Sequence, residues 1–166
     1  MRLPAYLSGS GKAMLAFRSP DEVRQLFADG LAIRLTRKGP RDVAALLKEL
    51  AATRKRGYSI DDETVREGVF SFGAPVFDAS GQVVAGVAVC INKALVAADQ
   101  GERHRDVALG VARTLSQRLG ASRDDVAKAG VKAGTTTTVT TTETAAAKRA
   151  APRSAGRRRA PVSPRT

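Results

Sequence analysis

Two apolar stretches joined by a short polar turn constrain this chain more than any other feature. They run from Val69 to Phe77 and from Gln82 to Ile91, and the turn between them is Asp78-Ala79-Ser80-Gly81. Asp and Ser favour the start of a turn, and Gly tolerates a positive φ at its end. Because both stretches are rich in Val or Phe and bounded by turn residues, they predict a β-hairpin.

Small and polar residues interrupt the predicted hairpin. Ser71 on its first strand, and Ala88 and Cys90 on its second, alternate as the residues of one strand face do. Small residues on a strand often leave room for something above the sheet. A concave sheet that faces the start of a helix would suit a small anionic molecule.

Helical segments surround this hairpin in the sequence. Their signals are small residues or caps at the start and glycines at the end. Strands mixed with helices around an antiparallel hairpin predict an α+β domain with a sheet covered by helices. The predicted helices start at Ser8-Gly9-Ser10-Gly11-Lys12, at Ser19-Pro20-Asp21-Glu22, at Pro40 (ending before Gly57) and at Asp99-Gln100-Gly101-Glu102; the last has Val107, Val111, Leu115 and Leu119 at i, i+4 spacing, reinforced by Ala108 and Ala112, and Leu31–Thr36 is a weak strand or a linker.

No group of residues predicts catalysis. The neighbouring acids Asp61, Asp62 and Glu63 would point to different sides of a strand, without a nearby His or Cys to complete a metal shell. Ser10 lacks the surroundings of a nucleophile elbow, and Cys90 in an apolar strand is typical of inert packing. We therefore predict no enzyme and no cofactor, and a small enzyme is the weakest of the functional hypotheses.

The amino-acid composition limits the kinds of site and the cellular location that can be expected. The chain has one cysteine and one histidine, so an internal disulfide is excluded and a His-based triad is unsupported. No apolar run approaches the roughly 20 residues that span a bilayer, which predicts a cytoplasmic protein without membrane contact. The net charge is +12, but residues 1–120 carry +5 and residues 121–166 carry +7.

The end of the sequence has a different character. Residues 135–144 include eight threonines, and Ala-rich and Arg/Pro-rich stretches follow. The segment has too few large apolar residues to offset the conformational entropy that the chain would lose on folding. We therefore predict a disordered basic tail over residues 122–166. Such a tail could bind nucleic-acid phosphates weakly, or could only add solubility.

The segments RGYSIDDE, GAPVFDASGQVVAGVAV, LPAYLSGSGKAMLAF and ALGVARTLSQRLGAS occur in an order and spacing that resemble the effector-binding domain of IclR-family transcriptional regulators. The likeness covers about residues 2–121 and assigns residues 1–121 to this domain. It implies a GAF/profilin-like antiparallel sheet flanked by helices. It also implies a sensor that binds a small metabolite, often an organic acid, and forms homodimers or homotetramers.

The resemblance also implies which residues face the ligand. Gly9 and Ser10 match the helix start that contacts a carboxylate, and Asp61 matches the first acid of a motif that borders the pocket. Ser71, Ala88 and Cys90 match strand positions whose side chains face the ligand. Since Ala88 has no polar side-chain atom and Cys90 bonds only weakly, this pocket is expected to be more apolar than in some members.

The family pattern and the sequence differ at the front. Members normally carry a winged helix-turn-helix, a linker helix and the first strands of the sensor domain before the position of Met1. The prediction is therefore an N-terminally truncated domain with an unpaired sheet edge inclined to associate. DNA would be contacted only through a missing N-terminal domain, or weakly through the basic tail. Two alternatives stay open: a nucleic-acid-associating protein that acts through this tail, and a non-functional fragment.

Overall fold

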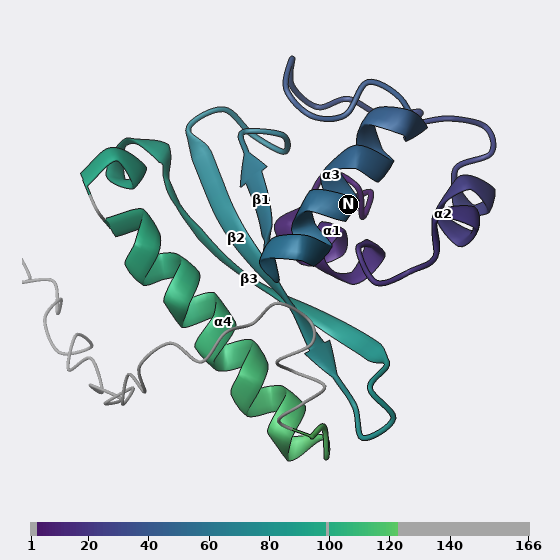
Figure 1. The fold of residues 1–166 in the computed structure, drawn as a ribbon. Coiled ribbons are helices and arrows are strands. Elements are labelled where there is room, and N and C mark those ends of the chain that lie inside the picture. Colours follow the sequence, from purple (N-terminus) through teal and green to yellow (C-terminus); the bar gives the residue numbers. More distant parts are fainter. Residues whose placement is uncertain (1–2, 99, 123–166) are drawn as a thin grey trace, which may run out of the picture.

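A computed structural model describes residues 3–98 and 100–122, and a three-stranded antiparallel sheet forms its centre (Figure 1). The strands are β1 (Ser59–Asp62), β2 (Val69–Phe77) and β3 (Val83–Asn92), in the order β1-β2-β3. The predicted hairpin is confirmed as β2 and β3, with one irregularity in register between Val76 and Phe77. Its turn is closed by the Asp78 carboxylate, which accepts hydrogen bonds from the N–H groups of Ser80 and Gln82.

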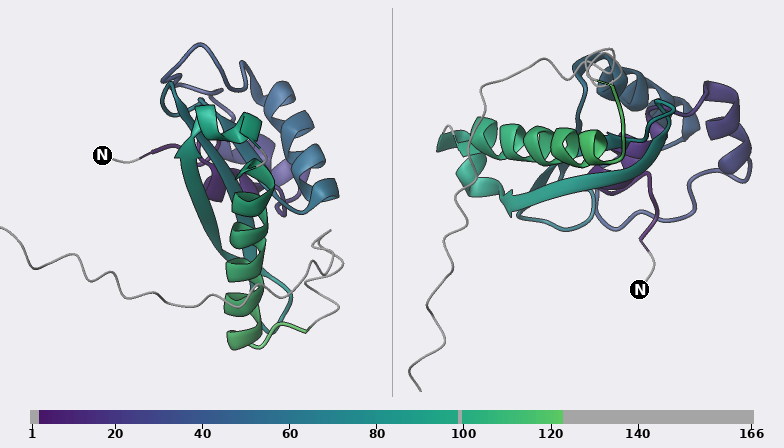
Figure 2. Two further views of the ribbon diagram at one scale, coloured as in Figure 1. Left: turned by 90° about the vertical axis from the view of Figure 1, so that its left-hand side faces the viewer. Right: turned by 90° about the horizontal axis from the view of Figure 1, so that it is seen from below.

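Helices cover both faces of the sheet (Figures 1 and 2). α4 packs against the face that carries Phe72 and Ala74, while α1 packs against the opposite face, which carries Ser71 and Gly73. The predicted α+β class is therefore confirmed. The helices are α1 (Gly9–Leu15), α2 (Pro20–Leu26), α3 (Val43–Arg56) and α4 (Gln100–Arg118), with the short 3-10 helix η1 (Lys93–Ala98) before α4.

Local chemistry explains where these helices begin and end. Ser19 caps α2 in a full capping box with Glu22, as predicted, and Gly57 ends α3 at a φ of 83°. The start of α3 was predicted at Pro40 and lies instead at Val43. There the Asp42 side chain accepts the N–H of Ala45 at 2.7 Å, because a carboxylate can satisfy a free first-turn N–H and proline cannot.

Residues 31–36 form no strand. The Tyr6 hydroxyl accepts a hydrogen bond from the N–H of Ile33 at 2.9 Å and donates one to its carbonyl at 2.8 Å. A side chain thus occupies the backbone groups that a neighbouring strand would have used, and the segment remains a linker between α2 and α3.

The buried face of α4 includes the small residues of the predicted apolar pattern, Ala108 and Ala112, but not its large ones. Ala108, Ala112 and Ser116 face the sheet and are at most 2% exposed, and Ser116 accepts the N–H of Phe77 at 2.9 Å. Small side chains let the helix approach the strands closely. The large residues of the predicted apolar stripe are about two-fifths to one-half exposed on one flank of the helix: Val107, Val111, Leu115 and Leu119.

A buried ion pair joins α1 to the rest of the domain. The Lys12 side chain is 1% exposed, and its ammonium donates to Glu49 Oε1 on α3 at 2.6 Å and to the Ile60 carbonyl on β1 at 2.5 Å. Around this pair α1, α2 and α3 share one apolar core that includes Leu7, Leu46 and Leu50. The predicted tail, apart from Ser122, lies outside the described residues.

Candidate functional site

The predicted site lies where the start of α1 meets the sheet. A Cβ added to Gly9 would lie 2.8 Å from Ser71 Oγ and 3.6 Å from Ala88 Cβ, so these three residues are neighbours. The Ser59 hydroxyl donates to the Gly9 carbonyl at 2.5 Å and fixes the height of the helix above the strands. The small residues of β2 and β3 do leave room above the sheet, and the first turn of α1 fills much of it.

Asp61 lies at the buried end of this site. Its side chain is 3% exposed; Oδ1 accepts the Thr64 N–H at 2.8 Å and the Thr64 hydroxyl, and Oδ2 lies 3.4 Å from Ser71 Oγ. Thr64 in turn lies 3.0 Å from the carbonyl of Leu7, just before α1. Asp61 therefore shapes the turn after β1 and holds it against the segment that leads into α1.

Ala88 and Cys90 form the open side of the site. They pair with Gly73 and Ser71 across the hairpin, point to the α1 side of the sheet, and are exposed. Ser10 is half-buried, whereas Ser71 is only 1% exposed. The six predicted residues thus form a shelf: a buried polar floor (Asp61 and Ser71), a helix start (Gly9 and Ser10) and an apolar rim (Ala88 and Cys90).

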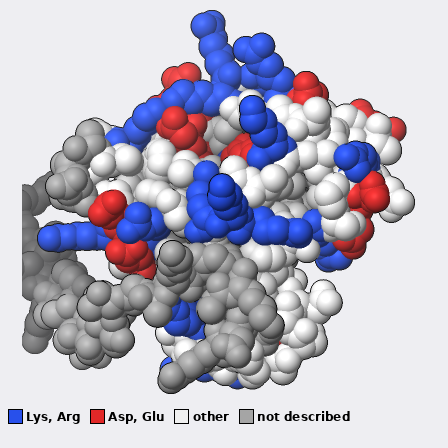
Figure 3. All heavy atoms as spheres, in the orientation of Figure 1, with Lys and Arg blue, Asp and Glu red and all other residues white. Residues whose placement is uncertain are grey.

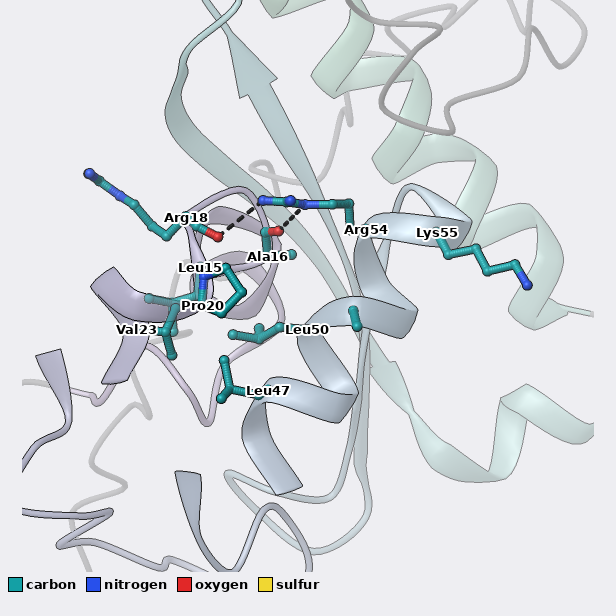
Figure 4. A pocket seen from close by; sticks show the side chains of 10 residues that line it. Leu15, Ala16, Arg18, Pro20, Val23, Leu47, Leu50, Arg54 and Lys55 are labelled. Atoms are coloured by element: carbon teal, nitrogen blue, oxygen red, sulfur yellow. Dashed lines mark hydrogen bonds between the residues drawn. The ribbon is translucent and has the colours of Figure 1, made fainter. Parts of the chain in front are cut away.

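Two surface pockets lie elsewhere in the described part of the chain, and neither includes a residue of the shelf. One of about 490 Å³ lies beside α1, α2 and the start of β3. The other, of about 270 Å³, lies between α1, α2 and α3 (Figure 4). Its charged groups do not converge: Lys55 extends away, and Arg54 donates to the carbonyls of Ala16 and Arg18 at 2.6 and 3.1 Å. This pocket is an apolar hollow without a polar anchor.

Sequence reasoning missed an ion cluster beside the shelf. Lys38 and Lys93 both contact Asp62 and Glu63, at 2.5 to 3.2 Å, and Glu63 also accepts the N–H of Gly68 at 2.9 Å. The cluster ties the loop before α3 to the ends of β1 and β3. Glu63 adopts a positive φ of 59°, unusual for a residue with a side chain, and its carboxylate contacts hold it there.

These contacts shift the acidity of the cluster. Hydrogen bonds from Lys38, Lys93 and the Gly68 N–H lower the pKa of Glu63 to about 2. Burial favours the neutral form of Asp62, but bonds from Lys93 and Lys38 outweigh it and lower the pKa of Asp62. The same two acids, Asp62 first, raise the pKa of Lys93 above its usual range. Both acids stay ionised at neutral pH, and the cluster is electrically balanced.

Acid should therefore weaken this end of the sheet. The pKa of Glu63 is lower in the folded state, about 2 against an ordinary 4.5, so its stabilisation is present above about pH 4.5 and is lost as the pH falls toward 2. We expect Glu63→Gln to flatten the fall in melting temperature between pH 5 and 2. The exposed neighbour Glu67→Gln should keep the wild-type slope, and equal slopes for all three proteins would contradict the assignment.

Two basic residues at the end of α3, Arg54 and Arg56, make contacts within the domain. Besides Arg54, the Arg56 guanidinium donates to the Tyr58 carbonyl at 2.6 Å and lies over the Tyr58 ring, where burial lowers its pKa. In Figure 3 Lys and Arg atoms gather across the middle of the face and lie beside Asp and Glu mainly toward its margins, while the surface over the tip of the β2–β3 hairpin is largely uncharged.

Among the residues that the structure describes, no group of three or more His, Cys, Asp or Glu side chains could hold a metal ion. Across residues 3–98 and 100–122, every helix is too short or too polar to cross a membrane.

Comparison with known proteins matches most of the described domain to one family. Residues 1–117 match the family described as Bacterial transcriptional regulator IclR C-terminal. The chain is 31% identical over 119 residues to the HTH-type transcriptional regulator KdgR of Escherichia coli K12, covering 72% of this chain and 45% of that protein. It is 30% identical over 123 residues to BhcR, an HTH-type transcriptional regulator of Paracoccus denitrificans, with coverages of 74% and 44%. The chain thus spans less than half the length of these relatives.

Solved structures agree with this match. The C-terminal domain of E. coli KdgR superposes with a TM-score of 0.67 at 31% identity, covering 72% of this chain and 73% of that one. The repressor BlcR of Agobacterium tumefaciens gives a TM-score of 0.63 at 39% identity, covering 72% and 49%. The sheet, its two helical layers and the matched sequence together show that this chain belongs to the IclR family of bacterial transcriptional regulators and corresponds to their C-terminal domain.

Proposed function

We propose that this domain binds a small carboxylate-bearing metabolite on the shelf and couples its presence to oligomerisation and transcription. The observation that carries the proposal is the meeting of the α1 start with Ser71, Ala88 and Cys90 on one sheet face. Ser8 accepts the N–H of Gly11, so a carboxylate would meet the first-turn N–H groups of Gly9 and Ser10. The apolar part of the metabolite would lie on Ala88 and Cys90.

The contacts below the shelf suggest how binding would reach the rest of the domain. α1 is held by the Ser59 hydroxyl at its first residue and by Glu49 and the Ile60 carbonyl through Lys12. A ligand that shifts the first turn of α1 must therefore strain contacts to β1 and α3. Packed and hydrogen-bonded contacts of this kind can carry energetic coupling between two distant sites when the element they hold, here α1, has two discrete arrangements.

The proposal predicts saturable stabilisation by organic acids. A ligand that binds only the folded state raises stability by about 2.7 kcal/mol at one hundred times its Kd. We expect at least one member of a panel of aliphatic and aromatic carboxylates to raise the melting temperature with concentration, and its uncharged amide to have no effect. The measurement is a thermal-shift titration of the full chain.

Ala88→Phe tests the location. Ala88 is exposed on the rim, so a large side chain there should occupy the shelf without disturbing the core, and the ligand response should disappear. Ala44→Phe, on the exposed side of α3, is the matched control and should keep the response. A response that survives Ala88→Phe would place the ligand elsewhere, and a cooperative melt unaffected by any carboxylate would contradict the carboxylate assignment.

A further inference from the structure

The hollow between α1, α2 and α3 has an apolar interior. Leu15, Val23 and Leu50 form its floor and are each at most 8% exposed, while Leu47 and Pro20 stand at its sides. In Figure 4 these five side chains gather around the same space. Its volume of about 270 Å³ lies below the roughly 300–1,000 Å³ of ordinary small-molecule sites. The hollow is therefore sized for a side chain of a partner rather than for a whole ligand.

Three cationic side chains surround this interior and form its rim. They are Arg18, Arg54 and Lys55, and among the described residues that line the hollow none is acidic. Arg18 and Lys55 extend away on opposite sides in Figure 4. Arg54 donates to two backbone carbonyls, which carry no net charge to balance its own. The positive charges are thus spread around an apolar opening instead of converging on one point, as a site for a small anion would require.

The charge of this rim is only partly balanced within the domain. In the described part of the chain, no ion pair includes Arg54 or Lys55. Arg18 contacts Glu22 at 3.3 Å, with the two side chains 59% and 48% exposed. Glu49, the one acid of α3, is held in the buried ion pair with α1. Lys and Arg atoms accordingly gather in the middle of the face in Figure 3, where Figure 1 places α3.

We propose that the hollow and its rim form a docking site for an acidic segment of another protein. An apolar side chain of the segment enters the hollow, and carboxylates before and after it meet Arg18, Arg54 and Lys55. An apolar anchor in a pocket with a polar rim is the usual arrangement of a binding hot spot. A rim of one charge also speeds the approach of an oppositely charged partner. Nucleic-acid phosphates would use the cations but leave the apolar interior empty, so a protein segment suits this surface better.

α1 connects this docking site to the shelf. Its first residue, Gly9, lies at the shelf, and its last, Leu15, lies in the floor of the hollow. The helix has seven residues, so the two ends are about 10 Å apart. A ligand that shifts α1 would then change the fit of the partner. This connection rests on the proposed function, whereas the docking site itself does not.

A pair of synthetic peptides tests the site. The probe is a short fluorescein-labelled peptide of Glu and Ala with two central leucines one helical turn apart, titrated with the full chain and followed by anisotropy. We expect saturable binding that weakens as salt rises. Replacing both leucines by alanine keeps every charge and should weaken binding about tenfold or more. The positive charge of residues 121–166 attracts both peptides alike, so the difference between them reports on the hollow.

Ala51→Phe tests the position of the anchor. Ala51 lines the hollow and is exposed, so the larger side chain should fill the space while the protein keeps its cooperative melt. The leucine peptide should then bind no better than the alanine peptide. Ala52→Phe is the matched control, because Ala52 is the next residue of α3, is exposed and does not line the hollow. It should keep the preference for leucine.

Glu22→Gln tests the rim by a gain of binding. The substitution removes the carboxylate that competes for Arg18, and glutamine can still serve the capping box of α2. Binding of the leucine peptide should tighten about two- to fivefold, the worth of an exposed ion pair. Glu67→Gln makes the same change in net charge at an exposed residue between β1 and β2, and should produce no gain.

Four results would overturn the proposal. These are equal affinity for the leucine and alanine peptides, a preference for leucine that survives Ala51→Phe, an equal gain from Glu22→Gln and Glu67→Gln, and a DNA duplex that binds through Lys55 where the peptides do not. An oligomer that only Ala51→Phe dissociates in sedimentation would assign the hollow to a second copy of this chain instead. If Ala51→Phe lost its melt, the peptide pair and Glu22→Gln would still decide. A failed thermal shift with carboxylates would leave all these outcomes unchanged.

Discussion

Glu49→Leu is expected to lower the free energy of unfolding by about 3–5 kcal/mol. The substitution leaves the Lys12 ammonium, 1% exposed, with the Ile60 carbonyl but no counter-ion. A buried charge that loses its partner costs this much, because neither water nor another charge replaces it. Urea unfolding followed by circular dichroism measures the loss. Lys48→Met, one residue earlier and exposed on α3, should change stability by less than about 0.5 kcal/mol.

The double substitution Lys12→Met with Glu49→Leu separates pairing from packing. A buried ion pair can often be replaced by apolar residues at little cost, so the double variant should recover much of the stability lost by Glu49→Leu alone. If the double variant is instead as unstable as the sum of the two single variants, the ion pair is not what connects α1 to α3.

Gly73→Ala is expected to destabilise the domain by about 1–3 kcal/mol, because the contact between α1 and the sheet has no space for a methyl group. The added Cβ would overlap the carbonyl of Gly9 and lie 2.5 Å from Ser59 Oγ, and both atoms belong to the hydrogen bond that seats α1. The helix must then move off β2. Ligand binding on the shelf should weaken as well, since the α1 start leaves Ser71.

Gly110→Ala is the control of opposite sign. An added Cβ at this exposed position of α4 meets nothing within 4 Å, and alanine favours a helix over glycine by about 0.5–1 kcal/mol. Its melting temperature should rise while that of Gly73→Ala falls. If both substitutions changed the melting temperature in the same direction, the close approach of α1 would not be the reason for glycine at position 73.

The sequence predicted those parts of the fold whose determinants are local. The turn at Asp78, the capping box at Ser19 and the glycine after α3 each act within a few residues, and all three are found. The predicted apolar pattern of α4 was right for Ala108 and Ala112 and wrong for its large residues, because helical spacing identifies an apolar stripe but not which of its residues meet the sheet. In this chain the sheet takes the stripe of small residues through Ala108 and Ala112.

The sequence was enough to predict the strand residues of the candidate site, but not the contacts that surround them. Alternation places Ala88 and Cys90 on one face of β3, and the register of the hairpin puts Ser71 of β2 opposite Cys90 on that face. By contrast, the contact of Ser59 with Gly9 and the cluster of Lys38 with Glu63 join residues far apart in the sequence. No local pattern marks such pairs. Whether the shelf holds a metabolite stays a prediction.

The seating of α1 on β2 has a consequence for how the domain folds. β2 and β3 are joined by a turn of a few residues, so their ladder closes a very short loop, whereas the Ser59–Gly9 bond joins groups 50 positions apart. Closing the longer loop costs more chain entropy and is rewarded only after the strands exist. We therefore expect the hairpin to form early in folding and α1 to dock onto it late.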